Sequence, residues 1–204
     1  DIDLATQQGN INVGPLDTTG NNGSAGNMRL ATQIGNITVR DTIRGVGYRG
    51  NGGNLTLETQ QGDIRVNEDI VLLSTGNRAG NGGNIRIRTD QGQIALAKSV
   101  NTISQSGGNG GHIEIQAGDR LNVPDAGNIT MGDVVSQANR RGRGGDITIT
   151  TSNGDIRPQR GIFSYSNQGS GGNITLATTN GDIIMQPDQD IQSRGCFDLN
   201  PNCT

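Results

Sequence analysis

Short runs of alternating apolar and polar residues recur along the whole chain, as in Leu55-Thr-Leu57 and Ile147-Thr-Ile-Thr150. Alternation with a period of two is typical of a β-strand that buries one face and exposes the other. Many of these runs follow a Gly-Gly-Asn motif or a close variant, and aligning on that motif reveals an internal repeat. The repeat units start at Asp1, Asn27, Asn54, Asn84, His112, Asp146 and Asn173.

Successive starts are 26, 27, 30, 28, 34 and 27 residues apart, so the repeat is about 28 residues long. Positions one and three after each start are apolar in every unit, and the position between them is polar. This pattern predicts the first strand of each unit. The first apolar column is Ile2, Met28, Leu55, Ile85, Ile113, Ile147 and Ile174. The second is Leu4, Leu30, Leu57, Ile87, Ile115, Ile149 and Leu176.

A glycine stands eight positions after six of the seven starts and six positions after the fifth, which predicts a tight corner with a positive φ angle. A second apolar pair follows the corner directly, as in Ile37 and Val39, and predicts a second strand. A looser apolar run before each glycine-rich segment, as in Ile162-Phe-Ser-Tyr-Ser166, predicts a third. The corner glycines are Gly9, Gly35, Gly62, Gly92, Gly118, Gly154 and Gly181.

The fifth unit is longer than the others. Leu121 and Val123 match the second strand weakly, whereas residues 127–131 match it well after seven extra residues. We therefore expect an insertion within residues 117–126.

Three strands per unit predict an all-β fold, a parallel β-solenoid of seven coils over residues 1–195, followed by a tail over residues 196–204. Stacking at about 4.8 Å per coil gives a length of roughly 33 Å. Each coil depends on its parallel neighbours to satisfy its backbone groups. No run approaches the 18 or so apolar residues of a membrane span, so we expect no membrane insertion.

Composition alone would allow disorder, because the 204 residues include 34 glycines, only 30% hydrophobic residues and 2% aromatic residues. The regular spacing of Ile, Leu and Val favours an ordered chain. The balance of 16 basic against 19 acidic residues gives a net charge of −3, so no strong global field points to nucleic acid or an anionic membrane.

The fullest copy of the repeat, Gly-Gly-Asn-Ile-x-Leu-x-Thr-x-x-Gly-Asp-Ile ending at Ile183, resembles the haemagglutinin-type repeats of bacterial two-partner-secreted exoproteins. The resemblance covers the chain up to about Ser193. It implies a right-handed β-helix, export through a dedicated outer-membrane transporter, and an adhesive or matrix role outside the cell or at its surface. We therefore expect a structural or adhesive segment without catalytic activity or cofactor.

Three roles stay open: the passive stalk of an adhesin, a ligand-binding surface, and the subunit of a filament. Residues 1–6 already match the first strand of a coil, so no polar cap precedes it. The uncapped edge of a first strand templates pairing with another chain. Its expected partner is either further coils of a longer parent chain or another copy docked end to end.

Catalysis is not predicted. His112, the single histidine, falls at the unit start, where its counterparts are Asn or Asp, so a corner or ladder role is favoured over a general base. Polysaccharide lyases also use parallel β-helices, but they typically need clustered acids and aromatic sugar platforms. This chain has no Trp, two Tyr and two Phe.

Asp155 and Asp182 are adjacent acids in the column after the corner glycines, and stacked carboxylates are possible Ca²⁺ ligands. Asp or Asn after Gly is also ordinary turn chemistry, which we favour over a metal site.

Arginines gather in the glycine-rich segments before the unit starts, where stacking would align them into a ridge. Such a ridge suits acidic polysaccharide or extracellular DNA, although a solvated loop is the favoured interpretation. The residues are Arg49, Arg78, Arg140, Arg141 and Arg143.

The two cysteines, Cys196 and Cys203, lie in the tail with six residues between them, and we interpret them as one local disulfide. A disulfide fits an oxidising, extracellular location.

Overall fold

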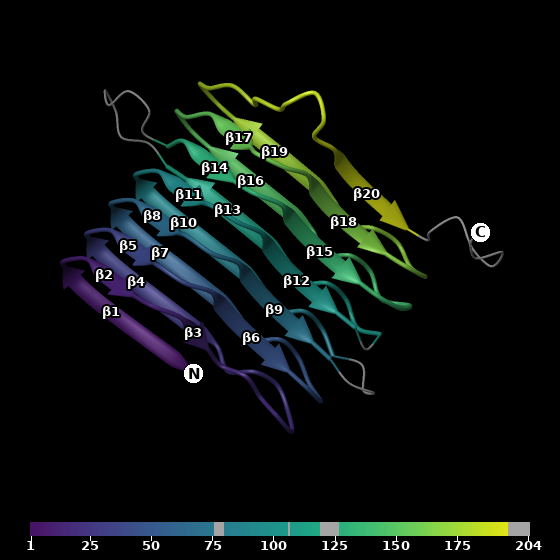
Figure 1. Ribbon diagram of the computed structural model, residues 1–204. Helices are drawn as coiled ribbons and strands as arrows, with labels where there is room; N and C mark the ends of the chain where they lie inside the picture. The colour runs from purple at the N-terminus through teal and green to yellow at the C-terminus, as the bar shows by residue number, and fades with distance from the viewer. Residues whose placement is uncertain (76–79, 106, 119–126, 196–204) are drawn as a thin grey trace.

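The computed structural model describes residues 1–75, 80–105, 107–118 and 127–195. All regular structure in these residues is β, and the strands form three parallel sheets that stack as a solenoid (Figure 1). The predicted fold class and the spacing of about 28 residues are confirmed. None of the described residues lies in a helix long and apolar enough to cross a membrane.

Sheet A contains the first strand of each turn, and the two apolar columns predicted for it are in register. Ile2 pairs with Met28, Met28 with Leu55, and the same column continues to Ile174. Its strands are β1 (Ile2–Gln8), β4 (Met28–Ile34), β7 (Leu55–Gln61), β10 (Ile85–Gln91), β13 (Ile113–Ala117), β16 (Ile147–Thr151) and β19 (Ile174–Thr178).

Sheet B contains the short second strands. Ile129 pairs with Ile94 and with Ile156, so in the fifth turn the segment after the insertion occupies the register. The weaker match, Leu121 and Val123, lies outside the described residues. The strands of sheet B are β2 (Ile11–Val13), β5 (Ile37–Val39), β8 (Ile64–Val66), β11 (Ile94–Leu96), β14 (Ile129–Met131) and β17 (Ile156–Pro158).

Sheet C contains the third strands, which the sequence defined least well. The four strands from the third to the sixth turn are as regular as those of sheet A, and each alternates inward and outward side chains. They are β3 (Leu16–Asp17), β6 (Ile43–Gly47), β9 (Ile70–Ser74), β12 (Val100–Ser104), β15 (Val134–Ala138), β18 (Ile162–Ser166) and β20 (Ile191–Gly195).

The number of complete turns is about six rather than the predicted seven. The seventh turn has β19 and β20, but its second strand is reduced to one bridge between Ile156 and Ile183. No further described turn covers this one, and Ile183 is 44% exposed. Pro187, which lacks a backbone N–H, then interrupts the chain before β20.

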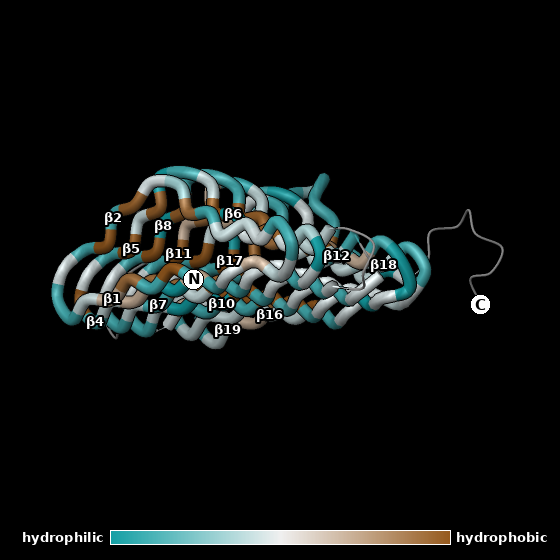
Figure 2. The backbone as a smooth tube through the Cα atoms, turned by 90° about the horizontal axis from the view of Figure 1, so that it is seen from below, coloured by the Kyte–Doolittle hydropathy of each residue, from teal (hydrophilic) through white to brown (hydrophobic). Residues whose placement is uncertain are grey.

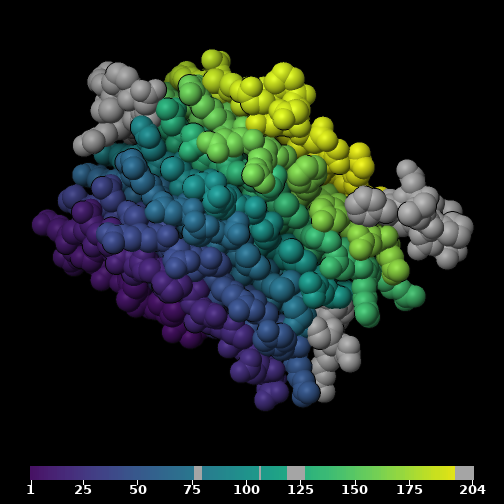
Figure 3. Space-filling view, viewed as in Figure 1, coloured from purple at the N-terminus to yellow at the C-terminus, as the bar shows by residue number. Residues whose placement is uncertain are grey.

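The core is a continuous apolar column inside the solenoid, and Figure 2 shows hydrophobic positions on the inner side of successive turns. Leu30, Ile64 and Ile149 are completely buried. The space-filling view shows the turns as successive bands, each in contact with the next (Figure 3). Burial is therefore supplied by neighbouring turns.

The corner glycines are required mainly by close contact between turns, which corrects the expectation of a positive φ at every corner. Gly9, Gly35 and Gly62 have φ of 125°, 146° and 151°. A Cβ on Gly92, by contrast, would lie 2.0 Å from the carbonyl oxygen of Gly62. From the second turn on, the stacked backbones leave no space for a side chain at these corners.

In the fifth turn the corner is Gly127 and not the predicted Gly118. The N–H of Gly127 donates to the carbonyl of Gly92, at 3.1 Å. A Cβ on Gly154 would in turn lie 2.3 Å from the carbonyl carbon of Gly127. The insertion displaced the corner downstream, which alignment on the unit start alone does not reveal.

Candidate functional site

Two ladders of asparagine side chains run along the glycine-rich corner between sheets C and A. In one ladder the Oδ1 atoms of Asn54 and Asn84 accept the backbone N–H of the residue one turn further on, at 2.9 Å in both cases. In the other, Asn81 donates its N–H to Asn51 at 2.9 Å, and Asn109 donates to Asn81 at 2.8 Å. Each amide oxygen therefore joins two successive turns.

A polar groove lies between the two ladders. Its floor is formed by the first glycine of each Gly-Gly pair, including Gly52, Gly82 and Gly110. A Cβ on Gly82 would lie 2.9 Å from the backbone nitrogen of Ile103, so the floor consists of backbone alone. The groove follows the stacking direction and presents mainly amide groups.

His112 occupies the ladder position predicted for it. Its backbone N–H donates to Asn84 Oδ1 at 2.9 Å, and the residue is exposed. An imidazole lacks the amide oxygen that continues the ladder. At the next turn the Asp146 carboxylate instead accepts the N–H of Asn173, at 2.7 Å, and the guanidinium of Arg143, at 3.0 Å.

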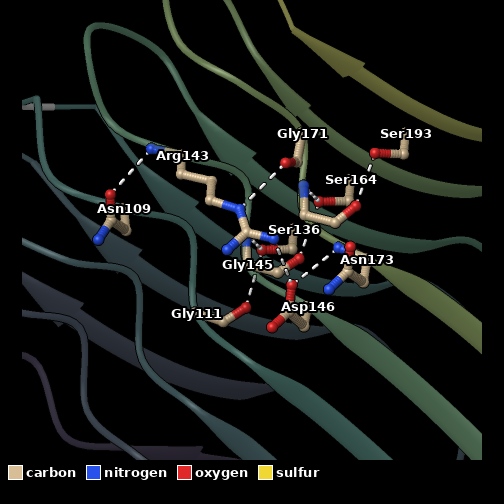
Figure 4. A network of polar contacts seen from close by, with 11 residues as sticks. Asn109, Gly111, Ser136, Arg143, Gly145, Asp146, Ser164, Gly171, Asn173 and Ser193 are labelled. Carbon is tan, nitrogen blue, oxygen red and sulfur yellow. Dashed lines mark hydrogen bonds and ion pairs between the residues drawn. The ribbon is translucent and has the colours of Figure 1, made fainter.

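Arg143 lines the groove, and Figure 4 shows the polar contacts that hold it. In addition to Asp146, its Nε donates to the carbonyl of Gly171 at 3.1 Å, and its backbone N–H donates to Asn109 Oδ1 at 2.8 Å. These bonds assign Arg143 a structural role in the corner.

The remaining arginines of the predicted ridge are not brought together. Arg49 follows β6, whereas Arg140 and Arg141 follow β15, three turns further along, which is about 14 Å at the spacing between parallel strands. All three are exposed, and Arg78 lies outside the described residues. Among these three residues, Arg140 and Arg141 are neighbours and Arg49 is isolated, so they do not form a continuous ridge.

Asp155 and Asp182, the candidate Ca²⁺ ligands, belong to a third side-chain ladder. Asp155 accepts the N–H of Asp182 at 2.8 Å and the guanidinium of Arg157 at 2.6 Å. The bond from Asp182, and then the one from Arg157, hold the pKa of the Asp155 carboxyl below its ordinary value. The carboxylate is thus engaged in turn stacking, and Asn128 rather than another acid precedes it.

Metal-ligating side chains do not converge elsewhere in the described part of the chain, where no group of three or more His, Cys, Asp or Glu could hold a metal ion. Cys196 and Cys203 lie outside the described residues, so their disulfide remains a prediction.

The outer face of sheet A contains ion pairs between successive turns. Arg86 bridges Glu58, at 3.2 Å, and Glu114, at 3.1 Å. Arg29 similarly approaches Asp3 across one turn, at 3.2 Å. A shallow groove crosses the first four strands here over the small side chains of residues 5 and 31. Each of its charged side chains has an ion-pair partner: Arg88 pairs with Asp90 within the groove, whereas Arg29 and Glu58 pair with Asp3 and Arg86 beside it.

A column of buried threonines, not anticipated from the sequence, seals the corner between sheets A and B. Thr89 Oγ1 donates to the carbonyl of Gly62 at 2.7 Å, and Thr151 Oγ1 donates to that of Gly127 at 2.6 Å. The signal was present, because threonine stands five positions after six of the seven unit starts. The exception is Ala117, in the unit with the insertion.

Most of the corner side chains described above join one turn to the next instead of converging on a common point. Comparisons with protein-family models, with curated proteins and with solved structures returned no match. The repeat and the geometry of its ladders are therefore the basis for assigning a function.

Proposed function

We propose that this chain is a structural segment of a secreted bacterial surface or matrix protein of the filamentous-haemagglutinin type, and that it acts as a non-catalytic stalk. The observation that supports this role is the set of side-chain ladders. Asn, Asp and Thr side chains at two corners donate to or accept from the backbone of the neighbouring turn. Their polar groups are used to maintain the stack.

A stalk must keep its length and direction under load. In this solenoid the load between turns falls on three parallel sheets and on the ladders at their corners. Each turn contacts mainly its neighbours, so added turns lengthen the rod without changing its cross-section.

Export as an unfolded chain suits the same architecture. A turn can pair one strand edge with the preceding turn and offer the other edge to the next, so folding proceeds in sequence as the chain emerges from a transporter. The resemblance of the repeat to two-partner-secreted exoproteins supports this route and an extracellular location.

A filament assembled end to end is the second candidate, and exposed apolar side chains on the terminal turns favour it. Leu4 is 38% exposed and Ile191 is 43% exposed, although their counterparts in internal turns are buried. A further turn, from the same chain or from another copy, would cover them.

The stalk role is tested by replacing residues 1–195 in the native protein with an unrelated β-solenoid of equal length. We expect bacterial adhesion to persist, because a stalk contributes length and not receptor recognition. Antibody labelling of intact cells should detect both proteins. Loss of adhesion at normal surface labelling would show a binding role, and labelling only after cell lysis would refute the extracellular assignment.

A further inference from the structure

The outer face of sheet C differs from the other outer faces because it is largely apolar. The outward positions of its middle strands carry Val71, Leu73, Ile103 and Val135, all partly exposed. On β18 the outward residues are Phe163 and Tyr165, two of the four aromatic residues of the chain. Figure 1 shows β18 and β20 side by side near the C-terminal end of the solenoid.

Two aromatic and two planar polar side chains line a shallow pocket on this face. Phe163 pairs with Gln192, and Tyr165 pairs with Arg194, across the parallel strands β18 and β20. The two aromatic residues are two positions apart on one strand, hence about 7 Å apart along it. The pocket therefore has an aromatic side and a hydrogen-bonding side.

Both aromatic rings are held in place. The Tyr165 hydroxyl donates to Gln137 Oε1 at 2.6 Å, and burial raises the pKa of this phenol, which keeps it protonated as a donor. The Phe163 ring occupies the space beside Gly161, where a Cβ would lie 2.2 Å from the ring. Rings fixed before binding lose little conformational entropy on contact with a ligand.

The polar side combines hydrogen-bond donors and acceptors. Gln192 donates to Asp190 Oδ2 at 3.0 Å, which orients its amide group. Arg194 is exposed, and its guanidinium has no ion-pair partner among the described residues. Arg194 thus supplies N–H donors, and Gln192 an amide oxygen, to the lining of one small pocket.

We propose that this pocket binds a pyranose ring of a polysaccharide. The apolar C–H face of the sugar packs on Phe163 and Tyr165, whose ring faces carry partial negative charge. Its hydroxyl groups, each both donor and acceptor, match Gln192 and Arg194. A uronic acid adds a carboxylate, which Arg194 can bind through two parallel hydrogen bonds.

The alternatives fit the pocket less well. A single-stranded nucleic acid stacks on aromatic rings but needs a basic groove along its backbone, whereas this pocket has one arginine and the acidic Asp190 beside it. A second copy of the chain would require an apolar centre with polar groups at the rim, whereas here Gln192 and Arg194 lie within the pocket. The proposal does not depend on the stalk function.

The test is an NMR titration of the purified chain with two hexasaccharides, a neutral β-1,4-glucan and an oligogalacturonate. Phe163→Ala should weaken binding of both about ten-fold or more, because it removes the stacking surface. Arg194→Gln should weaken binding of the acidic sugar alone, with the effect decreasing at higher salt. Arg44→Gln is the matched control, because Arg44 is an exposed arginine in an outward column of the same sheet, on β6.

Circular dichroism and thermal melting establish that the variants fold, as expected for outward positions. No chemical-shift change at Phe163 and Tyr165 with either sugar would refute the proposal, as would equal binding by the Phe163→Ala variant. If the chain binds an oligothymidylate and Phe163→Ala abolishes that binding, the ligand is a single-stranded nucleic acid and not a sugar. If the chain forms a dimer that Phe163→Ala abolishes, the pocket binds a second copy. None of these outcomes would affect the adhesion experiment above.

Discussion

At the residue scale, the stacking of the turns depends on glycines, which have no side chain, as much as on the side chains of the core. The second glycine of each Gly-Gly pair faces the carbonyl oxygen of its counterpart in the preceding turn, and a Cβ on Gly83 would lie 1.9 Å from that of Gly53. The high glycine content therefore reflects the contact distance between stacked backbones.

Gly83→Ala tests this requirement. We expect it to destabilise the chain by about 1–3 kcal/mol or more, because the new methyl group must push two turns apart. Gly23→Ala is the control, since a Cβ there meets nothing within 4 Å, and its effect should stay within about 1 kcal/mol. Urea denaturation compares the two, and equal midpoints would contradict the steric explanation.

The pKa of Asp155 gives a second prediction at this scale. Because the N–H of Asp182 and the guanidinium of Arg157 stabilise the carboxylate, its pKa should lie below 3.8 in an NMR titration, and Arg157→Gln should raise it. A lowered pKa contributes stability above pH 3.8 that is lost as the pH falls through the folded-state value.

Asp155→Asn is the corresponding stability test, since Asn keeps the ladder oxygen but loses the charge. The parent chain should be more stable than this variant above pH 4, and the difference should vanish in stronger acid. A midpoint for Asp155 at or above 3.8 would contradict the contacts assigned to it.

At the element scale, the strands of sheet A were predictable because one side of each strand is buried in the internal turns, so the apolar columns are visible in the sequence. The corner glycine of the fifth turn was not predictable from its distance to the unit start, because an insertion shifts Gly127 along the chain. Two of the bonds that hold Arg143 come from other turns, at Asn109 and Gly171, and no local pattern specifies them. The aromatic pocket depends likewise on the register between β18 and β20.

The inward register of β16 is tested by Ile149→Asp. Ile149 is fully buried, so the unpaired carboxylate should cost several kcal/mol. Thr150→Asp places the same group on the adjacent outward position, between Gln116 and Ala177, and should cost about 1 kcal/mol or less. Thermal melting that shows equal losses for both variants would mean that the inward and outward sides are assigned incorrectly.

At the scale of the whole molecule, the corners along the described solenoid are held by side-chain ladders, whereas the strands at its two ends each have one unpaired edge. β1 pairs only with β4, and β20 pairs only with β18. The two ends are complementary, because β19 and β20 of one copy can continue sheets A and C into β1 and β3 of another. Such a heterologous contact propagates without closing.

We therefore expect the isolated chain to associate end to end as its concentration rises. Light scattering across a concentration series measures the mass, and electron microscopy distinguishes short rods from filaments. Leu4→Lys should abolish association, because it places a charge on the open end of the core, where Leu4 is 38% exposed. Ile34→Lys is the control: Ile34 is 47% exposed but belongs to β4, which already has a neighbour on each side, so association should persist.

A polar cap fused before Asp1 should act like Leu4→Lys. A chain that stays monomeric at every concentration would exclude the filament, whereas filaments lost only in Leu4→Lys and in the capped chain would rank it above the stalk.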